Sequence, residues 1–107
     1  MLDKYLLHAL KDRKRFNTLR HAVPMELFSQ DTVSMIKWFN RYFNQYVEHS
    51  EIDVGTLETF IKLEGKLNDD QFVIIKRLLT GLREEVPQDV LVQTIHSLND
   101  RRTYSEL

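Results

Sequence analysis

The sequence predicts an all-α fold with about six helices, arranged as a small helical globule followed by a C-terminal helical hairpin. Apolar residues recur at spacings of three and four along nearly the whole chain, which is the period of an amphipathic helix. Only three glycines and two prolines interrupt the 107 residues, which leaves little room for turn-rich β structure. Hydrophobic residues make up 42% and charged residues 29%, as in an ordinary globular domain with one modest core.

The first quarter of the chain is expected to form two short helices and a connector. The first helix spans Leu2–Leu10, and the second runs over about Arg13–His21. A residue before proline is pushed away from helical backbone angles, so Val23-Pro24 ends the second helix. The apolar stretch Met25–Phe28 then leads to the next helix.

The third helix is expected over roughly Gln30–Val47 and is the most apolar of the chain. Ser29 is a favourable N-cap, and Asp31 in the first turn suits the positive end of the helix dipole. Apolar residues on two faces indicate a central helix that packs on more than one side. The first stripe consists of Val33, Ile36, Phe39, Phe43 and Tyr46, and the second of Met35, Trp38 and Tyr42.

Capping residues mark the fourth helix and the start of the fifth. Asp53 is predicted to cap the fourth helix, and Gly65 to end it as the left-handed residue of a Schellman motif that Leu67 closes. Asn68 or Asp69 then caps the fifth helix. The inward-facing residues of the fourth helix are Leu57, Phe60 and Ile61.

The last third of the chain, Asp69–Arg102, is predicted to form two helices folded back on each other at Glu85-Val86-Pro87. Their main stripes are Phe72, Ile75, Leu79 and Leu82 on one helix and Leu91, Ile95 and Leu98 on the other. The apolar residues off these stripes are Val73, Ile74, Leu78, Val90 and Val92. Either another protein chain covers this second face, or the hairpin packs wholly on its own domain. The chain would thus divide into a globule (1–67), a hairpin (68–103) and the start of a linker (104–107).

Composition excludes several classes of protein. The formal charge of −1 gives no overall attraction to nucleic acid or to an anionic membrane. The absence of cysteine rules out disulfides and thiolate metal sites, as is typical of a cytoplasmic protein. No apolar run is long enough to span a bilayer, and Met1–Tyr5 does not begin a signal peptide. We expect a cytoplasmic protein without a membrane partner.

No motif for catalysis is found. Neither GxxxxGK[ST] nor GxGxxG occurs, so we expect no nucleotide-driven activity, no cofactor and no enzymatic activity of this chain by itself. The four histidines do not pair at metal-ligand spacings. His49 has Glu48, Glu51 and Asp53 nearby, but a solvated acidic loop explains them more simply, so no metal site is predicted.

A cluster of basic residues is the sharpest charge feature of the chain. It consists of Lys11, Arg13, Lys14, Arg15 and Arg20, with Phe16 among them. Such a cluster is able to contact the phosphates of a nucleic acid. The simpler interpretation is a solvated face that acidic residues elsewhere balance, because no second aromatic residue joins the cluster.

The order of helices and three stretches of sequence resemble the N-terminal domain of DnaB-family replicative helicases. That domain is an all-α globule followed by a helical hairpin. The first stretch is Leu2–Leu10, followed by Phe16 and Leu19. The second is Pro24–Phe28, followed by the long third helix. The third begins with Ile52-Asp53-Val54-Gly55-Thr56-Leu57 and ends with Leu63-Glu64-Gly65-Lys66-Leu67. The glycine pair that often opens the family's fifth helix is replaced by Asp69-Asp70-Gln71-Phe72, so the resemblance implies a divergent member of the family, such as one from a phage.

The resemblance implies an assembly and docking domain of a replicative hexameric DNA helicase. Such a domain associates with copies of itself as a dimer or a hexameric collar, receives the primase or a helicase loader, and meets DNA only through the parent assembly. The ATP-binding motor of the family is absent from this sequence, so the chain is either an excised domain or a stand-alone relative that binds a helicase as an adaptor or inhibitor. A small nucleic-acid-binding protein that uses the basic cluster is a further alternative. The expected interface residues are Phe72, Ile74, Ile75, Leu78, Leu79, Leu82, Leu91, Ile95 and Leu98.

Overall fold

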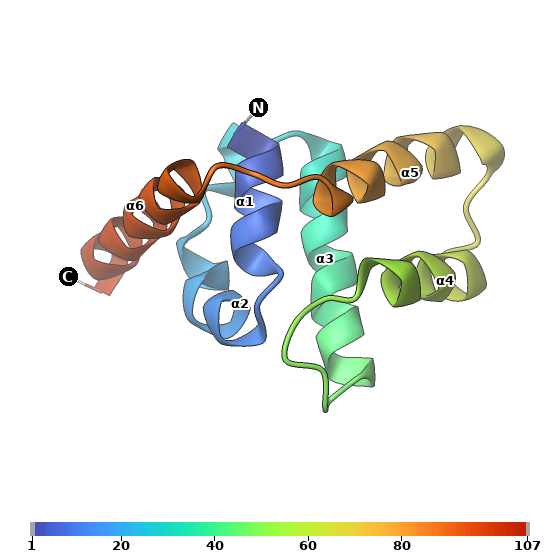
Figure 1. The fold of residues 1–107 in the computed structure, drawn as a ribbon, viewed down its shortest axis with the longest axis horizontal. Helices are drawn as coiled ribbons and strands as arrows, with labels where there is room; N and C mark the ends of the chain where they lie inside the picture. Colours follow the sequence, from blue (N-terminus) through green and yellow to red (C-terminus); the bar gives the residue numbers. More distant parts are fainter. Residues whose placement is uncertain (1, 107) are drawn as a thin grey trace.

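The computed structural model describes the backbone of residues 2–106 and the side chains of residues 3–100. Within that range the chain is helical, without strands, so the predicted all-α class and the six α-helices are confirmed (Figure 1). The elements are α1 (Leu2–Leu10), α2 (Arg13–Leu19), the 3₁₀ turns η1 (Arg20–Ala22) and η2 (Met25–Leu27), α3 (Gln30–Gln45), α4 (Val54–Glu64), α5 (Asp69–Arg83) and α6 (Gln88–Glu106). Because α6 continues to Glu106, most of the stretch expected to begin a linker is helical.

Helix α3 is the centre of the molecule, as its two apolar faces predicted. It packs against α1, α4 and α5, and both of its stripes are buried for most of their length. Phe39 and Tyr42 have no exposed surface, and the Trp38 ring meets the Phe60 ring of α4 edge-on. The core residues of α3 are Met35, Ile36, Trp38, Phe39, Tyr42 and Phe43.

The last two helices do not pack along each other as the predicted hairpin, and this is the main correction to the fold. Helix α5 packs on α1, α3 and α4, whereas α6 packs on α1, α2 and η1. Figure 1 shows α5 and α6 on opposite sides of α1, joined by an extended segment. The reason is that Ile75, Leu79 and Leu82 of α5 are buried in the core, so that α6 buries Leu98 against other helices.

Side chains that cap helix N-termini fix where several helices begin. Asp12 accepts a hydrogen bond from the backbone of Arg15, and Ser29 accepts one from the backbone of Thr32. At α5 the cap is Asn68, in a reciprocal capping box with Gln71. These bonds satisfy backbone donors that have no partner within their own helix.

The C-terminus of α4 differs from the prediction. Gly65 has φ −79° and is not left-handed, and the left-handed residue is Lys66, with φ 48°. A Cβ at residue 65 would lie 2.7 Å from the carbonyl oxygen of Ile61 and 3.1 Å from the Trp38 ring. The Ile61 carbonyl of α4 itself and the Trp38 ring of α3 therefore leave no room for a side chain here, whereas a left-handed backbone is not the reason for glycine. At the other end of α4, Asp53 occupies the N-cap position, but its side chain accepts from the Thr56 hydroxyl at 2.6 Å.

A polar cluster joins the N-termini of α1 and α3. The Asp3 carboxylate accepts hydrogen bonds from the hydroxyls of Thr32, at 2.7 Å, and Ser29, at 3.1 Å, and from the Ser29 backbone. Burial alone would raise the pKa of Asp3, but these hydrogen bonds outweigh it and lower the pKa. The ionised carboxylate therefore holds the two helix ends together.

Candidate docking surfaces

Most of the predicted interface residues belong to the core of the domain itself. Of the nine, only Ile74 is exposed, with 38% of its surface accessible. Four are fully buried, namely Ile75, Leu79, Leu82 and Leu98. Four are partly buried, namely Phe72, Leu78, Leu91 and Ile95. The apolar spacing that predicted an interface therefore reflects mainly the packing of α5 and α6 on their own domain.

One face of α5 nevertheless remains uncovered within the chain. Val73 and Ile74 are 56% and 38% exposed, and Asp70 and Arg77 flank them one turn away on either side. In the described part of the chain, the side chains of Asp70 and Arg77 make no hydrogen bond or ion pair. We call these four residues the α5 face.

A groove of about 370 Å³ lies between α1, η2 and α6, and we call it the α1–α6 groove. Its floor includes the buried side chains of Leu6 and Leu98, and Leu27 stands at its edge with 65% of its surface exposed. The Thr94 hydroxyl donates to the Val90 carbonyl at 2.9 Å, so its hydrogen-bonding capacity is engaged within α6. The lining residues are Tyr5, Leu6, Pro24, Leu27, Phe28, Val90, Gln93, Thr94, Ser97 and Leu98.

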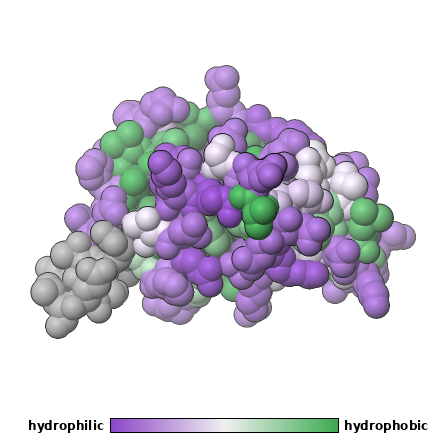
Figure 2. All heavy atoms as spheres, turned by 90° about the horizontal axis from the view of Figure 1, so that it is seen from below, coloured by the Kyte–Doolittle hydropathy of each residue, from purple (hydrophilic) through white to green (hydrophobic). Residues whose placement is uncertain are grey.

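The remaining exposed apolar side chains do not form a surface of this kind. The most exposed are Val47, in the turn after α3, at 71%, and Leu63, on α4, at 76%. Seen from below, the molecule is mostly hydrophilic, with apolar side chains in separate areas (Figure 2). Single exposed apolar residues are common on soluble proteins and need no partner.

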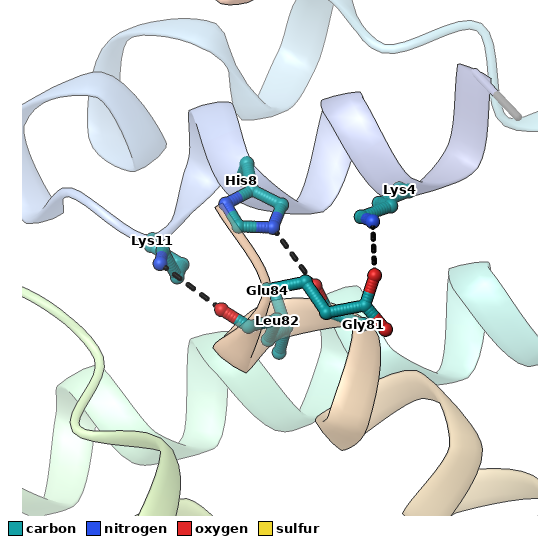
Figure 3. A network of polar contacts seen from close by, with 6 residues as sticks. All are labelled: Lys4, His8, Lys11, Gly81, Leu82 and Glu84. Atoms are coloured by element: carbon teal, nitrogen blue, oxygen red, sulfur yellow. Dashed lines mark hydrogen bonds and ion pairs between the residues drawn. The ribbon is translucent and has the colours of Figure 1, made fainter. Parts of the chain in front are cut away.

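Two side chains of α1, together with Lys11 directly after it, hold the C-terminus of α5 (Figure 3). His8 Nε2 donates to the Gly81 carbonyl at 3.0 Å, and Lys11 donates to the Leu82 carbonyl at 3.3 Å. Lys4 pairs with the Glu84 carboxylate at 2.7 Å. The donors bind the last carbonyls of α5, which have no partner within the helix, and the positive charges interact favourably with the negative end of its dipole.

The surroundings of His8 disfavour its protonated form. The side chain is 5% exposed, and burial lowers its pKa, an effect that the charges of Lys11 and Lys4 reinforce. The hydrogen bond to Gly81 and the charge of Glu84 act in the opposite direction and are outweighed. The Glu84 carboxyl in turn has a lowered pKa, because Lys4 bonds and attracts its ionised form.

The basic cluster is not one continuous surface, because most of its members bind carbonyl oxygens of the chain. Lys11 caps α5 as described, and Arg15 donates to the Ala9 carbonyl at 3.0 Å. Arg20 donates to Asn40 Oδ1 at 2.7 Å. Among the described residues, Lys14 is the one member of the cluster without such a contact. Contact with nucleic acid stays a prediction: these hydrogen bonds leave the positive charges in place but engage donors that a phosphate would need.

Arg13 makes the most contacts of the cluster. Its guanidinium donates to the carbonyls of Phe43 at 3.1 Å, Tyr46 at 2.6 Å and His49 at 2.6 Å, and it lies 4.6 Å from the centre of the Phe43 ring. These carbonyls lie at and beyond the C-terminus of α3, where no intrahelical donor remains. The Arg13 backbone N–H also donates to Ser50, which fastens the start of α2 to the α3–α4 loop.

The acidic loop around His49 is tied to the core. His49 Nδ1 is hydrogen bonded to the Tyr42 hydroxyl, which also accepts from the backbone N–H of Asp53. Burial raises the pKa of Tyr42, so the phenol keeps its proton, and the direction of its hydrogen bond with His49 depends on the tautomer of the imidazole. Within the described residues, no three histidine or acidic side chains are placed to hold a metal ion.

Sequence reasoning missed the α1–α6 groove because its walls come from three segments far apart in the chain. The prediction did single out Val90, as an apolar residue off the main stripe, and Met25–Phe28, as an apolar connector. The periodicity of the sequence does not show that α6 lies on the same side of α1 as the Met25–Phe28 connector. The signal that the sequence did offer was the run of apolar residues in a short connector, Met25–Phe28, and the structure shows that Leu27 of this run is exposed.

Comparisons with protein families, with curated proteins and with solved structures found no match. None of the helices in the part of the chain that the structure describes has both the length and the apolarity to cross a bilayer.

Proposed function

We propose that this domain acts by docking other proteins, not by catalysis, and that the α1–α6 groove receives an apolar segment of a partner. The observation that carries the proposal is the groove itself, with a floor formed by Leu6 and Leu98 and the exposed Leu27 at its edge. An exposed apolar hollow of this size on a small domain is more typical of a binding site than of ordinary surface.

The rim of the groove supports the same function. Gln93 and Ser97 are exposed on α6 and line the groove beside apolar Val90 and Leu98. A polar rim around an apolar centre is the usual anatomy of a protein–protein interface. The amide and hydroxyl groups can bond a partner's backbone while the apolar centre buries its side chains.

The narrower proposal is an assembly and docking domain of a replicative hexameric helicase in the cytoplasm. What supports it is the resemblance of the sequence, above all the stretch from Ile52 to Leu67. That stretch forms a helix with Asp53 at its N-cap position and glycine at its C-terminal end. The partner in the groove would then be the primase or the helicase loader. DNA and ATP would bind to the motor domain of the parent protein.

The test is the affinity of purified primase, and separately of purified loader, from the source organism, measured by calorimetry. Leu27→Glu places a charge at the edge of the groove and is expected to weaken binding at least tenfold, because buried apolar anchors dominate such interfaces. The matched control is Leu63→Glu, which introduces the same charge on α4 and should bind as the wild type does. Equal binding by Leu27→Glu and the wild type would overturn the groove as the docking site. Binding of neither protein to the wild type would overturn the helicase assignment.

A further inference from the structure

A hollow of about 320 Å³ between η1 and α3 is lined by charges of one sign, and we call it the cationic hollow. Arg20 lines it from η1, and Lys37 and Arg41 line it from α3. None of the described residues that line it is acidic. The ion pairs found within residues 3–100 involve other side chains, so no carboxylate there pairs with these three cations.

Like charges gathered in one hollow repel each other, which favours a site that an anion occupies. Lys37 and Arg41 are one turn apart on α3, a spacing at which like charges destabilise a helix. The chain as a whole carries a formal charge of −1, so the local surplus of positive charge does not follow from its composition. An anionic group in the hollow would relieve the repulsion and be attracted by all three cations.

Uncharged side chains hold both arginines of the cationic hollow in place. Arg20 donates to Asn40 Oδ1 at 2.7 Å, and its guanidinium carbon lies 5.5 Å from the centre of the Phe16 ring. The guanidinium carbon of Arg41 lies 4.5 Å from the centre of a Trp38 ring. A guanidinium carries five N–H donors in one plane, so these contacts orient the arginines without using up the donors that a carboxylate would accept from.

We propose that the cationic hollow binds an acidic segment of a partner protein, with its carboxylates on the three cations and one apolar side chain against Met25. Met25 is 36% exposed and, with the buried Ile36, gives the hollow an apolar part. Aspartates or glutamates beside one large apolar residue match both features. This inference goes beyond the docking function proposed above, because no residue that lines the α1–α6 groove lines the cationic hollow.

The same features disfavour a nucleic acid in the cationic hollow. Proteins that bind single strands stack the bases on exposed aromatic rings, whereas Phe16, the aromatic residue of the hollow, is 1% exposed. A longer nucleic acid would extend beyond the hollow over a chain whose formal charge is negative. Of the basic cluster between Lys11 and Arg20, only Arg20 lines the hollow, so the two are different surfaces.

Fluorescence anisotropy of a labelled peptide tests the proposal. The probe is a short peptide of glutamates around one central leucine, and the comparison peptide has glutamine in place of every glutamate. The wild type should bind the acidic peptide at least tenfold more tightly than the glutamine peptide, and added salt should weaken the binding.

Charge reversal at Lys37 locates the binding in the hollow. Lys37→Glu replaces an attraction by a repulsion and should weaken binding of the acidic peptide at least tenfold. Lys37 is exposed and makes no hydrogen bond or ion pair among the described residues, so the fold should be unaffected. The matched control is Lys76→Glu, which makes the same change of charge at an exposed position on α5 and should bind as the wild type does.

A second pair of measurements tests the apolar contact independently of charge. Met25→Ser should weaken binding of the peptide with the central leucine by about threefold, because less apolar surface is buried. The same substitution should not affect a peptide that has serine in place of the leucine. Lys37→Glu should weaken binding of both peptides, because both keep their glutamates.

Several outcomes would overturn the proposal. They are equal binding of the acidic and glutamine peptides, equal weakening by Lys37→Glu and Lys76→Glu, and no binding of the acidic peptide at millimolar concentration. Tighter binding of single-stranded oligothymidylate than of the acidic peptide, lost in Lys37→Glu, would make the hollow a nucleic-acid site instead. None of these results bears on the α1–α6 groove, because binding there is measured with the primase or the loader and at Leu27.

Discussion

His8 Nε2 lies 3.0 Å from the carbonyl oxygen of Gly81 and joins the middle of α1 to the last turn of α5. Lys4, one turn before His8 in α1, contacts Glu84, and Lys11, directly after the end of α1, contacts the Leu82 carbonyl. One face of α1, extended by Lys11, thus supplies three side-chain contacts at this end of α5. Because α6 packs on the opposite side of the same short helix, α1 determines where both long C-terminal helices lie.

The first prediction is that His8 makes the domain less stable in mild acid. Its pKa in the folded state is lowered from the usual 6.5, so below about pH 6.5 the unfolded chain binds more protons than the folded one. The free energy of unfolding should therefore fall as pH decreases from 6.5 through the folded pKa. In His8→Gln, whose amide can still donate to Gly81, denaturant titrations between pH 5 and 7.5 should show a smaller loss. His96→Gln, at an exposed position on α6, is the control, and an equal flattening there would contradict the account.

The second prediction is that Arg13 stabilises the domain. Arg13→Ala leaves the carbonyls of Phe43, Tyr46 and His49 without their shared donor and should lower the free energy of unfolding by about 2 kcal/mol or more. Lys14→Ala removes an equal charge from the exposed neighbouring position and should change stability by less than about 0.5 kcal/mol. Urea denaturation measures both. Similar effects of the two substitutions would show that the contacts of Arg13 contribute little.

The third prediction concerns two glycines that should respond with opposite signs. Gly65→Ala forces a Cβ to within 2.7 Å of the Ile61 carbonyl and should destabilise the domain by about 1 to 3 kcal/mol. Gly81→Ala meets no atom within 4 Å and should stabilise α5 by up to about 1 kcal/mol, because alanine loses less backbone entropy in a helix. Thermal unfolding followed by circular dichroism compares them. A neutral Gly65→Ala would mean that the last turn of α4 and the Trp38 ring can shift to accommodate the added Cβ.

Gly65 also illustrates that the ends of helices can be predicted from the sequence. Its position correctly marked the end of α4, because glycine signals a helix end whether it is needed for conformation or for close packing. The same holds for the caps: Ser29 and Asn68 begin their helices through bonds within a few residues, which sequence spacing reveals. Local signals of this kind gave the helices and most of their bounds.

What the sequence left open is which surfaces meet. The stripe of Ile75 and Leu79 shows that one side of α5 is buried, but the same pattern suits α6, another copy or the core as the covering surface. The role of Arg13 is equally hidden, because the carbonyls it binds lie at least 30 residues away in the sequence. The α1–α6 groove and the capping of α5 by His8 both depend on such distant contacts.

The most direct test of docking through the α1–α6 groove is a map of where the primase of the source organism contacts the domain. Backbone amide resonances of the ¹⁵N-labelled domain would be recorded with and without unlabelled primase. The account predicts that the largest shift changes fall on Leu27, Val90, Thr94 and Ser97 around the groove, and that the α3–α4 loop is unaffected. Changes confined to Lys14 and its neighbours, or no change at saturating primase, would contradict it.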